Sequence, residues 1–176
     1  MTQMTPVKIK KIITEIIDED PSRNTSMIAR ELSVPELTVV QSLPEKMVSL
    51  VGPEHFDAIT EEVDKWGELT IIVQTDSVIF EVKSALPKGS YAKGYYNIMG
   101  HKAPAGGHFR IDHLHTIAFV DKPFMGMQTL SIQFYNLAGN SMFKVFLGRD
   151  KKRALLDDQV ELYMALRQKI SGGDAL

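Results

Sequence analysis

The 176-residue sequence predicts an α+β protein in which a small helical unit precedes a largely antiparallel β-sheet and a C-terminal helix. Apolar residues recur with helical spacing as far as about residue 66. From Gly67 onward they alternate with a period of two, along short segments that turn residues connect. We therefore expect a helical N-terminal unit, residues 1–66, followed by an antiparallel-sheet domain with a closing helix, residues 67–176.

The N-terminal unit is expected to contain four helices. The first begins with Thr5 as N-cap and Pro6 as first helical residue, and isoleucines at positions 9, 12, 13, 16 and 17 form its apolar stripe. A second covers about Ser26–Leu32. A third begins at a capping box over residues 33–36 and ends at Pro44. Apolar residues three or four apart indicate a fourth: Phe56, Ile59, Val63 and Trp66.

The second region is expected to form strands joined by short turns. Leu69–Val73 and Val78–Val82 flank a Thr-Asp-Ser turn and predict a hairpin. The other predicted strands are Gly94–Met99, Gly107–Val120, Met127–Tyr135 and Ser141–Phe146. Asp150 is expected to cap the closing helix, whose apolar face carries Leu156, Val160, Tyr163 and Ile170.

Composition excludes several classes of protein. The chain has no Cys, so it has neither a disulfide framework nor a thiolate metal site. The first twenty residues mix lysines with acidic residues and predict no signal peptide. No segment approaches the roughly 18 apolar residues that span a membrane. We therefore expect a cytoplasmic protein that does not associate with membranes.

The distribution of charge argues against nucleic-acid binding. Residues 1–66 carry a net charge of −5 and residues 67–176 carry +3. Residues 26–43 have the length of a helix-turn-helix motif, but the expected recognition helix, Pro35–Leu43, contains no Lys or Arg and includes Glu36. This acidic unit would repel phosphate, so we expect it to serve packing or protein interaction. The mildly basic second region is suited to a small anionic ligand.

Four of the five histidines, at positions 101, 108, 113 and 115, fall within fifteen residues. On a regular strand His113 and His115 would share one face, whereas His108 has the opposite parity. A zinc site built from three of these histidines would need a bulge or a loop ligand. A protein that binds zinc or another single metal ion therefore stays an alternative, beside the interpretation that each histidine is an ordinary strand residue.

Common enzyme motifs are absent from the sequence. It contains no G-x-S-x-G elbow, no H-E-x-x-H pair, no P-loop and no G-x-G-x-x-G fingerprint. No catalytic residue is predicted.

Two segments are richer in aromatic and sulfur side chains than a turn requires. Gly89–Asn97 holds three tyrosines and one lysine around Gly94, and Phe124–Met127 places a glycine between two methionines. Such side chains usually belong to a core. Together they could also form a flat apolar slot with an oxygen or nitrogen ligand and basic residues at its rim, which is the environment that haem requires.

From Leu69 to Ile170 the sequence resembles the HutX/ChuX family of intracellular haem-utilisation proteins. The resemblance lies in five segments, Gly94–Asn97, Gly107–Arg110, Thr116–Ala118, Phe124–Met127 and Met142–Asp150. It implies a HemS/ChuS/ChuX-like fold and a homodimer whose subunit corresponds to half of a HemS/ChuS-type protein. It also implies a carrier that binds haem in the cytoplasm and passes it to a haem-degrading partner. Haem degradation by the protein itself is the enzyme alternative.

The resemblance also suggests the residues that bind haem. The family has an axial ligand just before the Gly-Tyr-aromatic-Asn motif, where Tyr91 stands here, and a second haem-associated histidine at the position of His115. We expect Tyr91, as phenolate, to ligate the haem iron and His115 to complete or support the site. Lys93 and Arg110 are candidates for propionate contacts. The candidate walls are Tyr95, Tyr96, Phe124, Met125 and Met127.

Overall fold

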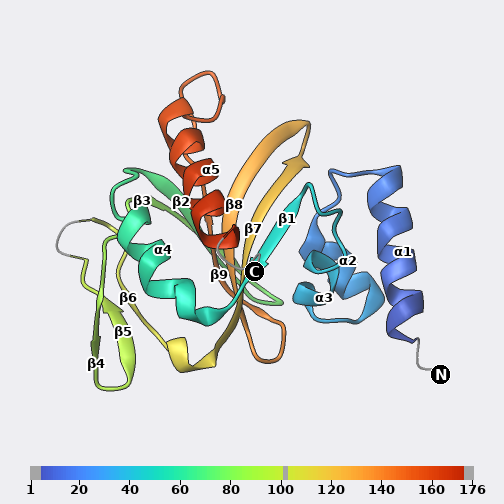
Figure 1. Ribbon diagram of the computed structural model, residues 1–176, viewed down its shortest axis with the longest axis horizontal. Coiled ribbons are helices and arrows are strands. Elements are labelled where there is room, and N and C mark those ends of the chain that lie inside the picture. The colour runs from blue at the N-terminus through green and yellow to red at the C-terminus, as the bar shows by residue number, and fades with distance from the viewer. Residues whose placement is uncertain (1–4, 101–102, 173–176) are drawn as a thin grey trace.

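The computed structural model describes residues 5–100 and 103–172 (Figure 1). The elements of the N-terminal part are α1 (Pro6–Glu19), α2 (Thr25–Leu32), α3 (Glu36–Val40), β1 (Val48–Val51), the 3₁₀ turn η1 (Pro53–His55) and α4 (Phe56–Val63). The next are β2 (Leu69–Gln74), β3 (Ile79–Ser84), β4 (Ser90–Ala92), β5 (Tyr95–Ile98), β6 (Gly107–Phe109) and the 3₁₀ turn η2 (Ile111–His113). The chain continues with β7 (Leu114–Phe124), β8 (Met127–Asn136), β9 (Ser141–Phe146) and α5 (Asp157–Ser171).

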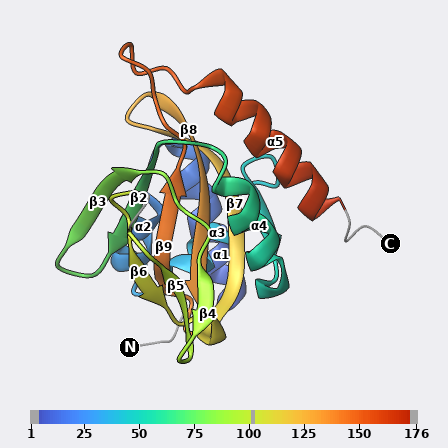
Figure 2. The same ribbon diagram turned by 90° about the vertical axis from the view of Figure 1, so that its left-hand side faces the viewer.

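The strands form two antiparallel sheets, and the predicted α+β class is confirmed. The larger sheet has the strand order β1-β7-β8-β9-β2-β3, and the smaller has the order β4-β5-β6. Helices α1–α3 cover part of one face of the larger sheet, whereas α4, α5 and the smaller sheet lie on the opposite side (Figures 1 and 2). We call these the α2 face and the α4 face.

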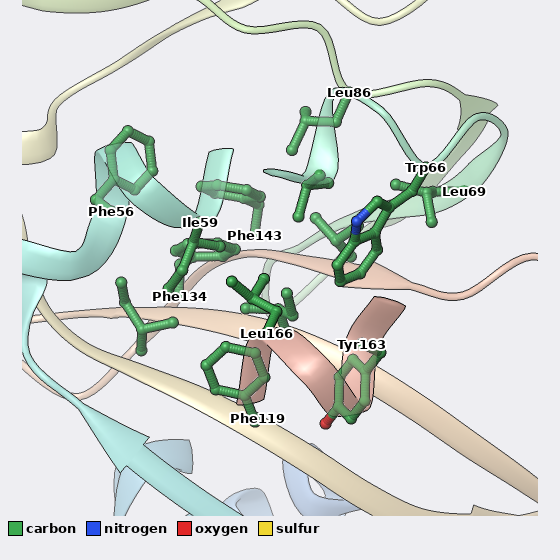
Figure 3. Packing of buried hydrophobic residues seen from close by; sticks show 14 of the residues in the cluster. Phe56, Ile59, Trp66, Leu69, Leu86, Phe119, Phe134, Phe143, Tyr163 and Leu166 are labelled. Atoms are coloured by element: carbon green, nitrogen blue, oxygen red, sulfur yellow. The ribbon is translucent and has the colours of Figure 1, made fainter. Parts of the chain in front are cut away.

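Each face of the larger sheet has its own core, because side chains along a strand alternate between faces. The α4 face packs against α4, α5 and the smaller sheet, and Figure 3 shows its aromatic centre. There the rings of Phe134 and Phe143 stack with centroids 4.2 Å apart, and Phe56 meets Phe134 edge-on at 5.8 Å. The α2 face packs Ala118 and Tyr135 against α1–α3.

The first two helices agree with the sequence pattern. Thr5 caps α1 by accepting the backbone N–H of Lys8 at 3.4 Å, and Ile13 and Ile17 of the predicted stripe are buried. In α2 the cap is Asn24, whose side chain accepts from the backbone N–H of Ser26.

The predicted capping box over residues 33–36 is wrong. Ser33 ends α2 in the left-handed conformation, and α3 begins after Pro35 without any side-chain cap. Glu36 is instead buried, and its Oε1 accepts hydrogen bonds from Lys144 Nζ and Thr25 Oγ1, each at 2.6 Å. The carboxylate thus ties α3 to β9, because a buried cation is a stronger partner than the N–H groups of a helix end.

Strand β1 was not predicted. Its four residues lie within the segment expected to be helical, and they pair with β7 through Val51↔Ile117. So short a segment between Pro44 and Gly52 offers too little alternation to be recognised. The core of the α4 face also includes Val51 and most of the apolar residues of α4. The division of the chain at residue 66 stays a prediction.

Two further expectations are corrected. The single strand predicted over Gly107–Val120 is interrupted by η2, because β6 pairs with the smaller sheet and β7 with the larger. His113 therefore lies in the 3₁₀ turn and does not share a strand face with His115. Asp150 does not cap α5, since its carboxylate closes a turn by accepting the backbone N–H groups of Lys152 and Ala154. Helix α5 begins at Asp157.

The Glu36–Lys144 ion pair yields a prediction about stability. Replacing Glu36 with Leu leaves the ammonium group of Lys144 buried without its carboxylate, so the free energy of unfolding should fall by about 3–5 kcal/mol. The double variant Glu36→Leu/Lys144→Met should lie close to the wild-type value, since it removes both charges. Urea unfolding followed by circular dichroism measures both. A single variant as stable as the double variant would contradict the prediction.

Candidate functional site

The tyrosine-rich segment forms the β4–β5 hairpin of the smaller sheet. Lys93 and Gly94 both have positive φ, 53° and 78°, which is the backbone of a two-residue type I′ turn. Tyr91 precedes this turn on the outer strand of the smaller sheet, and 58% of its surface is exposed. The hairpin therefore holds a solvent-exposed phenol two residues before its turn.

Tyr91 rests on a buried aromatic neighbour. Its ring meets that of Tyr96 edge-on at 5.1 Å, and Tyr96 is itself packed against Phe56. The Tyr96 hydroxyl donates to Thr60 Oγ1 at 3.3 Å and accepts the backbone N–H of Gly89 at 2.7 Å. A Cβ at position 89 would lie 2.7 Å from the Tyr96 ring, so only glycine permits this approach.

The hydroxyl of Tyr91 donates to Asp57 Oδ1 at 2.8 Å, at the start of α4. Desolvation raises the pKa of the Tyr91 phenol far above its ordinary value, and the hydrogen bond to Asp57 raises it further. In the free protein the phenol is therefore protonated at neutral pH. A metal ion that binds the oxygen as phenolate must displace this proton.

The predicted site residues of the smaller sheet lie on two different faces. Strand register pairs Tyr91 with Tyr96, so these two side chains share one strand face, whereas Tyr95 is paired with Ala92 on the opposite face. The Arg110 guanidinium stacks over the Tyr95 ring at 5.6 Å and forms an ion pair with Asp112 at 2.6 Å. Tyr95 and Arg110 thus share a surface from which Tyr91 and Tyr96 point away.

His115 lies at the start of β7, where the pairing with β8 has a bulge between Leu114 and Thr116. Its side chain is exposed, and Nδ1 lies 2.8 Å from Thr116 Oγ1. Neither a hydrogen bond nor a ring contact joins it to Tyr91 among the residues that the structure describes. The start of β7 and the β4–β5 hairpin nevertheless lie at the same end of the molecule in both views (Figures 1 and 2).

The predicted walls Phe124, Met125 and Met127 lie elsewhere. They form the β7–β8 turn, in which Met125 and Gly126 have positive φ. Nine strand residues separate this turn from His115, which corresponds to roughly 30 Å at about 3.3 Å per residue. The expectation that this turn and the tyrosine-rich hairpin form one slot is therefore wrong for a single chain.

A cleft opens on the α2 face, where helices α1–α3 leave part of the larger sheet uncovered. This cleft has a volume of about 540 Å³, which is typical of small-molecule sites. Residues of β2, β3, β7, β8 and β9 line it, together with the start of α2 and the loop after β9. Of the predicted site residues only Phe124 belongs to it. The cleft was missed because its residues meet only through strand pairing.

The lining of the cleft is mixed in character and positive in charge. Its five cations are Lys83, Lys122, Lys144, Arg149 and Arg153, and its three carboxylates are Glu68, Glu81 and Asp150. Apolar parts of the wall come from Ile72, Leu130, Phe124 and Phe146. This combination favours an anionic ligand with an apolar body.

Metal binding by a cluster of side chains finds no support within residues 5–100 and 103–172. No group of three or more His, Asp or Glu side chains there could hold a metal ion. His101 of the predicted histidine cluster lies outside the described residues. In the same ranges, no helix is long and apolar enough to cross a membrane.

Comparison with known proteins identifies the family. Residues 49–166 match the family model described as haem utilisation ChuX/HutX. The chain belongs to this family. It is 35% identical over 167 residues to a Vibrio cholerae protein named "Intracellular heme transport protein HutX", and the match covers 95% of this chain and 86% of the relative.

Solved structures of the ChuX/HutX type share the fold. An Erwinia carotovora protein is 35% identical with a TM-score of 0.85, over 96% of this chain and 99% of the other. A structure titled "Structure of the Heme Binding Protein ChuX" is 34% identical with a TM-score of 0.81, over 89% and 97%. PhuS of Pseudomonas aeruginosa, at 14% identity and a TM-score of 0.74, matches over 97% of this chain and 47% of its own length. That last likeness shows the fold alone.

Proposed function

We propose that this protein is a carrier that binds ferric haem in the cytoplasm and passes it to a haem-degrading partner. The main support is membership of the ChuX/HutX family together with 35% identity to a relative named as an intracellular haem transport protein. The 34% identical ChuX structure is titled as a haem-binding protein. In this proposal haem is the cargo. Side chains of the protein ligate the iron, contact the apolar ring and pair with the propionates.

Tyr91 is the residue that we propose as iron ligand. It is the exposed phenol of the β4–β5 hairpin, and its hydroxyl already donates a hydrogen bond to Asp57. An anionic phenolate stabilises ferric over ferrous iron, which suits storage and transfer rather than oxygen activation. His115, at the same end of the molecule, is proposed to support the site. Tyr96 supplies the apolar surface beneath the ligand.

The other residues predicted to contact haem could do so only if the haem extends around the hairpin or also contacts a second chain. The turn that follows Tyr91 contains Lys93, and Tyr95 and Arg110 lie on the face of the hairpin opposite Tyr91. A haem that extends past the hairpin from Tyr91 would bring its propionates close to the positive charges of Lys93 and Arg110. Phe124, Met125 and Met127 are too far from Tyr91 in one chain. If they contact haem bound at Tyr91, a second copy of the protein must supply them.

We propose that the protein is a homodimer that pairs at the edge of the larger sheet. Strand β3 is one of the two edge strands of the larger sheet, so one row of its backbone N–H and C=O groups has no partner strand among the described residues. Ile79 and Phe80 point to opposite faces of this strand, and each is 62% exposed. A twofold pairing of β3 with β3 would cover both side chains and satisfy the free edge.

The ligand assignment predicts the behaviour of Tyr91→Phe in a haemin titration. The variant loses the ligating oxygen, so resonance Raman modes of an iron–phenolate bond should disappear and haemin affinity should fall by about tenfold or more. Tyr95→Phe is the matched control, since it keeps the aromatic ring and removes a hydroxyl on the opposite face of the same hairpin, so the iron–phenolate modes should persist. An unaltered spectrum and affinity for Tyr91→Phe would refute the assignment.

The carrier function predicts the fate of bound haem under reducing conditions. With a reductant and oxygen the complex should keep its Soret band, and addition of an apo haem-degrading enzyme should shift that band to the spectrum of the enzyme complex. Steady loss of the band with release of iron, before any partner is added, would instead indicate that this chain degrades haem itself.

The dimer proposal predicts that Phe80→Glu weakens association, because charges facing each other across an edge pairing repel. Analytical ultracentrifugation should then detect a monomer where the wild type sediments as a dimer. Val7→Glu is the control, since Val7 is an exposed apolar residue on α1, away from the β3 edge. A Phe80→Glu protein that stays dimeric would place the interface elsewhere.

A further inference from the structure

The two longest strands of the larger sheet, β7 and β8, end together in an apolar turn. Its residues, Pro123–Met127, carry no charge. The side chain of Phe124 is 40% exposed and that of Met125 is 76% exposed, and neither belongs to the core of the α2 face or of the α4 face. The turn therefore holds two large apolar side chains at its surface.

Met125 occupies a position of this turn that does not suit it. Met125 and Gly126 both have positive φ, 49° and 74°, as in a two-residue type I′ turn. Asn, Asp and Gly are favoured at the first of these positions, because the Cβ of a larger side chain crowds the backbone there. A methionine thus combines backbone strain with solvent exposure. Neither stabilises the isolated chain, so we look for the role of this side chain in contact with another molecule.

The loop after β9 is basic and lies beside the β7–β8 turn. Its guanidinium group at Arg149 joins the two segments, because Nη1 donates to the carbonyl of Arg153 at 2.8 Å and Nη2 donates to the carbonyl of Gln128 at 2.6 Å. The loop and the turn lie at the same end of the molecule in both views (Figures 1 and 2). Residues 147–156 of this loop contain four cations, Arg149, Lys151, Lys152 and Arg153, and one carboxylate, Asp150.

The cations of this loop are available to a partner. Lys151, Lys152 and Arg153 are exposed, and no ion pair among the described residues includes them. The carboxylate of Asp150 accepts two backbone N–H groups of the loop itself. The two aspartates that follow lie in the first turn of α5, where the helix dipole stabilises negative charge. The loop thus carries an excess of positive charge on a backbone fixed by hydrogen bonds.

An apolar turn beside unpaired cations fits a protein surface that is acidic around an apolar depression. In such an interface the apolar contact supplies affinity, and the charges at its rim steer the approach of the partner. Four cations in one loop offer few phosphate contacts, and the chain as a whole has a net charge of −2, so a nucleic acid is a poorer match. A carrier must also release its receiver, which suits a small interface with a charged rim.

We propose that residues 123–127 and 147–156 form the surface through which this protein docks on its haem-degrading receiver. Met125 contacts an apolar depression of the receiver, and Lys151 and Lys152 pair with carboxylates around it. The inference rests on the proposed function as a carrier and adds to it the chemistry of the receiver. The docking surface uses neither the hairpin of Tyr91 nor the β3 edge proposed for the dimer.

The test measures transfer of haem from the loaded protein to the apo form of a haem-degrading enzyme, by stopped-flow absorbance at several concentrations of that receiver. The wild-type rate should rise with receiver concentration. Lys151→Glu/Lys152→Glu should lower the second-order rate constant about tenfold or more at low salt, since the reversed charges repel an acidic surface. The difference should shrink at high ionic strength, because salt screens exposed charges.

Lys8→Glu/Lys10→Glu is the matched control for charge. It makes the same change at two exposed lysines of α1, and it should transfer haem at the wild-type rate. Circular dichroism checks that both double variants are folded.

Met125→Asn tests the apolar contact while preserving the turn, because asparagine adopts positive φ more readily than methionine. Its transfer to the receiver is compared with its own rate of haem loss to an apo-globin scavenger, which requires no docking. Relative to that rate, transfer should be about fivefold or more slower than in the wild type.

The outcomes separate the docking surface from the carrier function. A wild-type rate of transfer in either Lys151→Glu/Lys152→Glu or Met125→Asn would overturn the docking surface and leave the carrier function standing. Co-sedimentation with vesicles of anionic phospholipid that is lost in Met125→Asn would overturn it too, by assigning the surface to a membrane. A wild-type rate that does not depend on receiver concentration would refute directed transfer itself, and with it both proposals.

Discussion

The alternation of side chains along the strands of the larger sheet is the constraint on which the rest of the structure depends. Residues next to each other on β8 or β9 point to opposite faces, so one strand serves two environments. On the α4 face the aromatic rings of Phe134 and Phe143 anchor α4 and the smaller sheet. On the α2 face the neighbouring polar residues Gln133 and Lys144 form the floor of the cleft.

The two candidate ligand positions follow from this division. Tyr91 depends on the α4 face, because Tyr96 and the start of α4 hold its ring and its hydroxyl. The cleft lies on the α2 face, and its extent is set by how much of that face helices α1–α3 cover. Buried polar interactions fix that boundary, since Glu36 ties α3 to β9 through Lys144 and ties α3 to α2 through Thr25.

Much of the local structure could be predicted from the sequence. Helix α1, the β2–β3 hairpin and the β7–β8–β9 meander follow from caps, periodicity and turn residues that act within a few positions. The errors lie where a distant partner outweighs the local signal. Glu36 stands at the position of a capping-box glutamate, but its carboxylate instead accepts a hydrogen bond from Lys144, 108 residues later. Strand β1 forms because it pairs with the edge of β7. The sequence of its four residues does not reveal that pairing.

The sequence alone determined the fold class, the family and the candidate phenol, because helical and strand periods and family motifs are carried by neighbouring residues. Only the tertiary structure decided that Tyr91 and Tyr95 face apart, that the β7–β8 turn lies far from both, and that Lys122 is buried at the edge of the cleft. The physical reason is that strand register and burial are properties of non-local pairs, which a one-dimensional pattern does not contain.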